Sequence, residues 1–235
     1  MNTTDYSKAF YLFEGITKGT LSEEMAEAVR AFIATENLYV SATREITTKL
    51  ENLNSEFRYT RERNPIQYIQ TRVKTPSSIL RKLTRRGYDV SVESARKNLT
   101  DIAGVRVICS YINDIYMISD LLVSQDDIRL VRTSDYIKNP KPNGYRSLHL
   151  IVTVPVFLST NVEFVNVEIQ IRTIAMDFWA SLEHELAYKI IDKETDPTAV
   201  ELKACANEIA EIDKRMQNLY NISVSKQKQE NHGAL

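Results

Sequence analysis

Cysteine is scarce in this chain, since only two of its 235 residues are cysteines. Cys109 and Cys205 are far apart in the sequence, and neither a Cys-x-x-Cys pair nor a cluster of Cys and His surrounds them. Disulfide-rich proteins and structural zinc proteins depend on such groupings. The sequence therefore predicts neither a disulfide framework nor a structural zinc site.

Long apolar runs are also missing from the sequence. No stretch of about 18 apolar residues occurs, so we expect no membrane span. The first residues, MNTTDYSKAF, have neither the basic start nor the apolar run of a signal peptide. These absences favour a cytoplasmic protein that has no membrane partner.

A large charge of one sign is absent as well, because the formal net charge is −1. The charge is nevertheless uneven, since residues 58–97 contain eleven Lys or Arg and only three Asp or Glu. A basic segment in a near-neutral chain indicates a polyanion site, either for nucleotide phosphates or for a nucleic acid. A basic helix face in contact with solvent is the alternative at this point.

The spacing of apolar residues predicts an α/β fold of the α+β kind. Consecutive strands in the middle of the chain favour a mixed or largely antiparallel sheet flanked by helices. The first and last helices are amphipathic, and each can serve either as an oligomer interface or as a cover for the sheet. The expected helices are 21–57, 77–86, 114–124, 173–191 and 197–224, and the expected strands are 101–111, 128–136, 148–154 and 162–172.

A group of basic residues surrounds the helix that Pro76 begins. Ser78 and Lys82 are four residues apart and share one helical face, and Arg85 follows about one turn later. Arg72 and Lys74 precede the same helix start. Exposed N–H groups and cationic side chains attract the same anion, so this segment is suited to a triphosphate. An ordinary basic surface helix remains the alternative.

Two carboxylates lie beside predicted strands. Asp101 starts one strand, and Glu168 lies within VNVEIQIR, where it shares a face with Gln170 and Arg172. Three polar groups on one face of a central strand are costly unless they serve a site. Mg²⁺ bound to a polyphosphate is typically held by one or two carboxylates. The alternative for this face is simple exposure to solvent.

The segment KNPKPNGYRSLH is predicted to be a loop, because it contains two prolines and an Asn-Gly pair. Tyr145 can stack on a purine, and Asn143 can bond to a base edge. Lys141, Arg146 and His149 can reach phosphates or a sugar. In the helix that follows, His184 and Glu185 are weaker candidates, and a structural role is at least as common for such a histidine.

Five ordered motifs give these residues a common interpretation. RVKTPSSILRKL, DIAGVRVI, DYIKNPKPNGYRSLH, VEIQIRT and DFWASLEHELAYK together resemble the synthetase domain of the RelA/SpoT homologue family over residues 64–189. The resemblance implies a nucleotidyltransferase-like mixed sheet flanked by helices. The sequence has no HD-type metal motif and no room for the hydrolase domain of the long members. We therefore expect a small alarmone synthetase of the RelP/RelQ group.

This resemblance implies transfer of pyrophosphate from ATP to the ribose 3′-hydroxyl of GTP or GDP, which gives (p)ppGpp and AMP. It implies that Arg72 and Arg106 sandwich the adenine, that Lys74, Ser78, Lys82 and Arg85 hold the ATP phosphates, that Asp101 and Glu168 bind Mg²⁺, that Tyr145 and Asn143 bind guanine, that Lys141 and His149 bind the acceptor phosphates, and that Gln170 supports the ribose. Glu168 is also the candidate general base. A non-catalytic nucleotide-binding or RNA-binding module is the alternative, and a module of that kind has no need of a metal pair.

The resemblance, the spacing of apolar residues and the polar composition of the tail together predict the organisation of the chain. We expect an N-terminal helical segment over 1–63, a catalytic domain over 64–191, a C-terminal helix over 192–224 and a disordered tail over 225–235. The two terminal helices are expected to build a homo-oligomer, with a tetramer as the expected form.

Two short segments depart from the motifs of the family. The stretch Gln67-Tyr68-Ile69-Gln70 stands where RelQ-type members carry Glu-Phe-x-Thr, which favours the RelP type and argues against activation by product. The stretch Arg132-Thr133-Ser134-Asp135 matches neither motif linked to acceptor preference, so it does not predict whether GDP or GTP is preferred.

Overall fold

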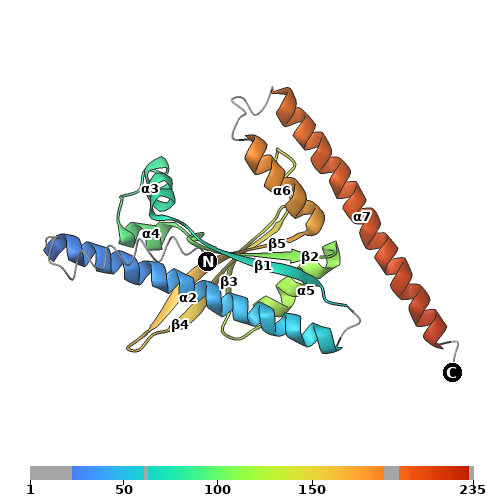
Figure 1. Ribbon diagram of the computed structural model, residues 1–235, viewed down its shortest axis with the longest axis horizontal. Coiled ribbons are helices and arrows are strands. Elements are labelled where there is room, and N and C mark those ends of the chain that lie inside the picture. Colours follow the sequence, from blue (N-terminus) through green and yellow to red (C-terminus); the bar gives the residue numbers. More distant parts are fainter. Residues whose placement is uncertain (1–22, 61–62, 188–195, 233–235) are drawn as a thin grey trace.

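The computed structural model describes residues 23–60, 63–187 and 196–232. Its centre is a five-stranded sheet with the order β1-β2-β5-β4-β3 (Figure 1). Strands β2 and β5 are parallel, and the other neighbours are antiparallel, which confirms the predicted mixed sheet. The strands are β1 (Ile66–Val73), β2 (Ala103–Cys109), β3 (Arg129–Asp135), β4 (Leu148–Phe157) and β5 (Val162–Thr173). The helices are α2 (Glu23–Thr60), α3 (Pro76–Arg85), α4 (Val92–Asn98), α5 (Ile112–Val123), α6 (Ile174–Ala187) and α7 (Pro197–His232).

Helices α2 and α5 cover one face of the sheet, and the hydrophobic core lies between them and the strands (Figure 1). Alternate residues of β5, such as Val167 and Ile169, point into this core and are fully buried. The apolar stripe of α2 meets them with side chains that include Ile46 and Leu50. From residue 38 onward, then, the stripe of α2 covers the sheet of its own chain, so this part of the helix does not provide the oligomer interface expected of it.

Strand β1 and helix α4 were not predicted from the sequence. Strand β1 lies at an edge of the sheet, and most of its side chains are polar and exposed. It therefore lacks the apolar alternation by which a strand is recognised. Helix α4 is only seven residues long, and its clearest signal is the cap at Ser91, whose side chain accepts a hydrogen bond from the backbone N–H of Ser94.

Helix α7 packs along α6 and the start of α5 (Figure 1). Asp213 accepts a 2.6 Å hydrogen bond from Thr173, and the indole N–H of Trp179 donates to the carbonyl of Leu202 at 2.8 Å. The helix continues to His232, so the tail expected to be disordered from residue 225 is helical as far as that residue. Its last two turns carry helix-compatible Lys, Gln and Glu, and their polarity led to the wrong prediction.

Helices α6 and α7 expose a set of large apolar side chains. Its members on α7 include Ile212, Met216, Leu219 and Ile222, which recur at helical spacing. The surface therefore has an apolar stripe that the described part of the chain does not cover. No described helix is both long enough and apolar enough to cross a membrane.

Candidate active site

Two rows of residues cross the face of the sheet opposite α2, and each row has one member from every strand. The register of the sheet pairs Gly104 with Arg72 on one side and with Glu168 on the other, and Glu168 pairs with Ile151. One row therefore consists of Arg72, Gly104, Glu168, Ile151 and Arg132, and the adjacent row consists of Gln70, Arg106, Gln170, His149 and Ser134. The sheet topology thus places residues from five distant segments on one platform.

The platform forms the floor of two adjoining cavities of about 640 and 450 Å³. The larger lies over β1 and β2, and its lining includes Arg72 and Arg106. The smaller lies over β4 and the loop that follows β3. The two linings have four residues in common, Lys74, Asp101, Glu168 and Gln170. The arrangement provides two ligand sites that meet at a pair of carboxylates.

Asp101 lies just before β2 and contacts two lysines. Lys74 Nζ is 3.1 Å from its Oδ2, and Lys82 of α3 donates a short hydrogen bond to the same oxygen. Burial alone would raise the pKa of Asp101, but the two lysines hold it below its ordinary value. The carboxylate is therefore ionised at neutral pH.

The second oxygen of Asp101 bears on metal binding. Oδ1 is buried and has no hydrogen-bond partner in the part of the chain that the structure describes. Buried carboxylate oxygens are normally satisfied, so an unpartnered one beside a second carboxylate is suited to a cation. Among the described residues there is no cluster of three or more metal-ligating side chains. Two carboxylates are a donor set that fits Mg²⁺, which takes its remaining oxygen ligands from phosphates and water.

Glu168 lies at the centre of β5, and its two oxygens have different partners. His149 Nδ1 is 3.4 Å from Oε1, and Gln170 Nε2 donates to Oε2 at 3.0 Å. Burial would raise the pKa of this carboxyl, but His149 and Gln170 lower it below its ordinary value. Like Asp101, Glu168 is ionised at neutral pH.

The loop between β3 and β4 brings Tyr145 over the smaller cavity. Its hydroxyl contacts His149 Nε2 at 2.8 Å, and Lys141 Nζ lies 4.6 Å from the centre of its ring. Gly144 adopts a φ of +93° beside it, and a Cβ there would come within 2.6 Å of the Ala206 side chain on α7. The turn therefore requires glycine, and the loop is pressed against α7.

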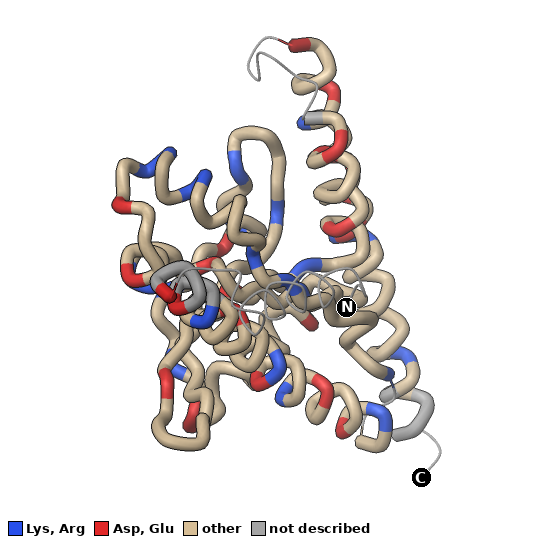
Figure 2. The backbone as a smooth tube through the Cα atoms, turned by 60° about the vertical axis from the view of Figure 1, so that its left-hand side comes forward, with Lys and Arg blue, Asp and Glu red and all other residues tan. Residues whose placement is uncertain are grey.

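The structure brings most of the predicted site residues together. Three predicted residues stand apart from both cavities. Lys82 reaches Asp101, whereas Ser78 bonds to the Thr75 hydroxyl at 3.0 Å and Arg85 is exposed at the end of α3. Basic positions mark α3 (Figure 2), and its last turn carries both Lys82 and Arg85.

Several weaker candidates lie outside the site. Arg146 donates to the carbonyl of Ala206 at 3.2 Å and to Asn207 at 3.1 Å, so it holds the loop on α7, and it lines neither of the two cavities. His184 and Glu185 are exposed on α6 and line neither cavity. Their neighbour Glu183, in contrast, does line the smaller cavity.

Sequence analysis missed several residues that line the cavities, most of them on or beside the edge strands β1 and β3. The cavity linings also include Gln70 and Thr71 from β1, Gly104 from β2, and Arg132, Ser134 and Tyr136 from and beside β3. For β3 the position just before the predicted loop was a usable signal. For β1 there was none, because the strand itself was not recognised.

The fold and the site define an α+β nucleotide-binding protein with a carboxylate pair between two cavities. The family described as the region found in RelA / SpoT proteins matches residues 71–193. GTP pyrophosphokinase YwaC of Bacillus subtilis is 45% identical over 179 residues, which are 76% of this chain and 85% of that protein. This chain belongs to the RelA/SpoT family.

Solved structures agree with this assignment. Small alarmone synthetase 2 from Bacillus subtilis matches with a TM-score of 0.73 at 42% identity, over 81% of this chain and 98% of that one. Small alarmone synthetase 1 from the same organism, solved bound to its product pppGpp, matches with a TM-score of 0.71 at 33% identity, over 78% and 93%. The relatives are therefore similar over nearly their whole length.

Proposed function

We propose that this chain is a GTP/GDP pyrophosphokinase, which transfers the β,γ-pyrophosphate of ATP to the ribose 3′-hydroxyl of GTP or GDP. The observation that carries the proposal is the pair of cavities that share Lys74, Asp101, Glu168 and Gln170. A transfer between two nucleotides needs two adjacent sites with ionised carboxylates where they meet. The names of the similar proteins, GTP pyrophosphokinase and small alarmone synthetase, agree with it.

In the proposed arrangement ATP occupies the larger cavity and the acceptor occupies the smaller one. Arg72 and Arg106 line the first and provide planar cationic groups for the adenine. Tyr145 provides an aromatic platform for guanine in the second, with Asn143 and Lys141 beside it. The Lys74 ammonium is in both linings, which places positive charge where the ATP phosphates would meet the acceptor ribose.

The chain's residues then act mainly by positioning and by charge. The 3′-oxygen of the acceptor forms a bond to the β-phosphorus of ATP, and the bond from that phosphorus to the oxygen bridging to the α-phosphorus breaks. AMP leaves with the bridging oxygen. Glu168 accepts the proton of the 3′-hydroxyl, and its low pKa keeps it ionised for this role. Lys74 and Lys82 stabilise negative charge that develops on the phosphates.

Asp101 and Glu168 would hold Mg²⁺ in this proposal. The unpartnered Oδ1 of Asp101 supports this assignment. Bound Mg²⁺ supplies Lewis-acid neutralisation of the phosphate oxygens. The proposal also includes a cytoplasmic location, where ATP and GTP are available, and assembly into a tetramer through the exposed apolar stripe of α6 and α7.

The test is to incubate the protein with ATP, GTP and Mg²⁺ and to separate the nucleotides. We expect AMP and a guanosine 3′-diphosphate product in equal amounts, because the attack is on the β-phosphorus. Release of ADP would show attack on the γ-phosphorus and would contradict the proposal. With 3′-deoxy-GTP the product should be absent, whereas 2′-deoxy-GTP should still react. Binding of both nucleotides without any turnover would favour the non-catalytic alternative.

A further inference from the structure

Arg172, near the end of β5, lies on the same face as Glu168 and Gln170, one row beyond the platform, and is buried there although arginine is rarely buried. Its exposed fraction is 2%. Its Nη1 lies 3.4 Å from the Oδ1 of Asp177, a carboxylate on the first turn of α6. Its Nε is buried without a partner in the described part of the chain. Burial of a charge costs free energy unless the charge is well paired, so the partners of Arg172 account for its position rather than packing alone.

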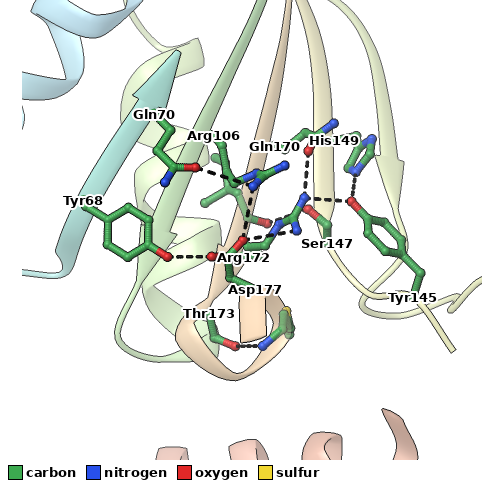
Figure 3. Close-up of polar contacts among 12 residues, drawn as sticks. Tyr68, Gln70, Arg106, Tyr145, Ser147, His149, Gln170, Arg172, Thr173 and Asp177 are labelled. Carbon is green, nitrogen blue, oxygen red and sulfur yellow. Dashed lines mark hydrogen bonds and ion pairs between the residues drawn. The ribbon is translucent and has the colours of Figure 1, made fainter. Parts of the chain in front are cut away.

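The other end of the guanidinium points toward the acceptor cavity. Nη2 donates to the Tyr145 hydroxyl at 3.0 Å and to Gln170 Oε1 at 2.7 Å (Figure 3). Arginine can only donate hydrogen bonds, so the Tyr145 oxygen accepts from it and turns its own proton toward His149 Nε2. With Nε2 as the acceptor, the other ring nitrogen, Nδ1, carries a proton, and that N–H faces Glu168 Oε1.

Two relays therefore run from one arginine to the two oxygens of Glu168. The first passes through Tyr145 and His149 to Oε1, and the second passes through Gln170 to Oε2. Every member of these relays other than Arg172 lines the acceptor cavity. Arg172 lies next to them on the same face of the sheet and lines neither cavity.

Asp177 forms an ion pair with Arg172 and is itself contacted by two further residues. Tyr68 of β1 donates to its Oδ2 at 2.5 Å, and Arg106 Nη1 is 3.5 Å from its Oδ1 (Figure 3). Arg106 lines the larger cavity, the proposed ATP site. The Asp177 carboxylate therefore contacts both Arg106 on the ATP side and Arg172 next to the acceptor site. The donor and acceptor sites therefore share a buried counter-charge.

We propose that Arg172 is a positioning residue, which fixes Tyr145 and Gln170 for the acceptor nucleotide and orients Glu168 through them, and that Asp177 anchors it. This inference rests on the proposed function for the identity of the acceptor, a guanosine nucleotide. Beyond the proposed function, it assigns a role to Arg172, which acts on the site without contacting either substrate. It also assigns Asp177 the role of linking the two halves of the site.

The test uses the conservative variant Arg172→Lys, which keeps the charge beside Asp177 but loses the two-pronged donor. GDP affinity is measured by calorimetry, beside the affinity for a non-hydrolysable ATP analogue. We expect the dissociation constant for GDP to rise about tenfold or more, as for loss of a charged hydrogen bond, and that for the ATP analogue to stay within about twofold. Asp177→Asn should weaken both, because it also releases Arg106.

Arg63→Lys is the matched control. Arg63 makes a two-pronged ion pair with Asp114 at 2.8 and 2.6 Å, and it lines neither cavity. Its variant should lower the melting temperature and leave both affinities unchanged. If Arg63→Lys weakened GDP binding as much as Arg172→Lys, or if Arg172→Lys bound GDP like the wild type, the positioning role would be wrong.

A double substitution separates positioning from general loosening. In a Tyr145→Phe background the hydroxyl relay is already missing, so Arg172→Lys should weaken GDP binding by a smaller factor than it does in the wild type. Equal factors in the two backgrounds would overturn the relay. Because binding is the readout, a wild type that binds GDP but releases no AMP would refute the proposed reaction while these ratios still decide the role of Arg172.

Discussion

Gly104 of β2 and Glu168 of β5 are partners in the parallel register at the centre of the sheet. Gly104 therefore lies on the floor of the larger cavity, next to the carboxylate pair, without a side chain of its own. A Cβ at this position would lie 3.5 Å from the carbonyl oxygen of Arg72 and 3.9 Å from that of Glu168, which are ordinary contact distances. The backbone thus tolerates a side chain here, and the glycine keeps the cavity open.

The first prediction follows from the open space above Gly104 in the larger cavity. Gly104→Val should fold, because a β-branched residue suits a strand, but its methyl groups would enter the proposed adenine site. We expect the KM for ATP to rise about tenfold or more, which corresponds to roughly 1.4 kcal/mol, with little change in the KM for GTP. Gly104→Ala is the graded control and should give a smaller rise. A larger effect on GTP than on ATP would place the donor elsewhere.

The second prediction concerns the carboxylate pair. Asp101→Asn or Glu168→Gln should lower kcat by about 100-fold or more, the range for loss of one group that stabilises a transition state electrostatically. Asp127→Asn is the control, because Asp127 is also paired with a lysine, Lys49 at 2.6 Å, but lies away from both cavities. AMP release at different Mg²⁺ concentrations is the measurement. Near-normal turnover in either active-site variant would refute the assignment.

The third prediction separates the two sides of the site. Tyr145→Ala should raise the KM for GTP or GDP by about 10- to 100-fold, because stacking of a base on an aromatic ring contributes about 1–3 kcal/mol. The KM for ATP should change little. Tyr59→Ala is a suitable control, since Tyr59 is exposed at the end of α2. If the KM for ATP rose as much as that for GTP, the ring would serve both nucleotides or only the fold.

The polar face of the site was largely predictable from local sequence. Alternation in VEIQIR assigned Glu168 and Gln170 to one face, and a strand observed from Val162 to Thr173 confirms that pattern. The Asn-Gly pair before Tyr145 predicted the loop. Both signals depend on residues that are close together in the chain, where side-chain period and turn chemistry apply directly.

Contacts between distant segments were not predictable in this way. Tyr68 and Asp177 are 109 residues apart and meet only because β1 pairs with β2. Strand β1 itself gave no apolar signal, because an edge strand exposed to solvent does not need one. The role of Arg172 was equally hidden, since the sequence shows the face on which it lies but not the distant partners, Tyr145 and Asp177, that meet it there.

The fourth prediction is a pH dependence of stability that arises from Asp213. Burial against α6 raises the pKa of this carboxyl above its ordinary value, although the hydrogen bond from Thr173 opposes the rise. A raised folded-state pKa favours the protonated form, so its contribution to stability is complete below the ordinary pKa and is lost as pH rises through the raised one. Asp213→Asn should therefore increase the free energy of unfolding at pH 7.

Urea denaturation at two pH values checks the sign of the change in the free energy of unfolding. The gain in the Asp213→Asn variant should be present at pH 7 and should shrink toward about pH 4, near the ordinary pKa of an aspartate. Asp196→Asn, at the turn before α7, serves as the control for the substitution itself. A variant less stable than the wild type at pH 7 would mean that the charged form of Asp213 is favoured.

The fifth prediction concerns assembly. Leu219 and Ile222 on α7 are 59% and 53% exposed, and they lie three residues apart in the stripe that includes Ile212 and Met216. An apolar stripe on a long helix is normally buried, and a second copy of the chain is the simplest cover. We expect a tetramer at micromolar concentration by light scattering, and Leu219→Glu with Ile222→Glu should reduce the mass. The exposed pair Lys214→Glu and Arg215→Glu changes charge without removing apolar area and is the control. A wild type that is monomeric under these conditions would contradict the prediction, as would an unchanged mass in the Leu219/Ile222 variant.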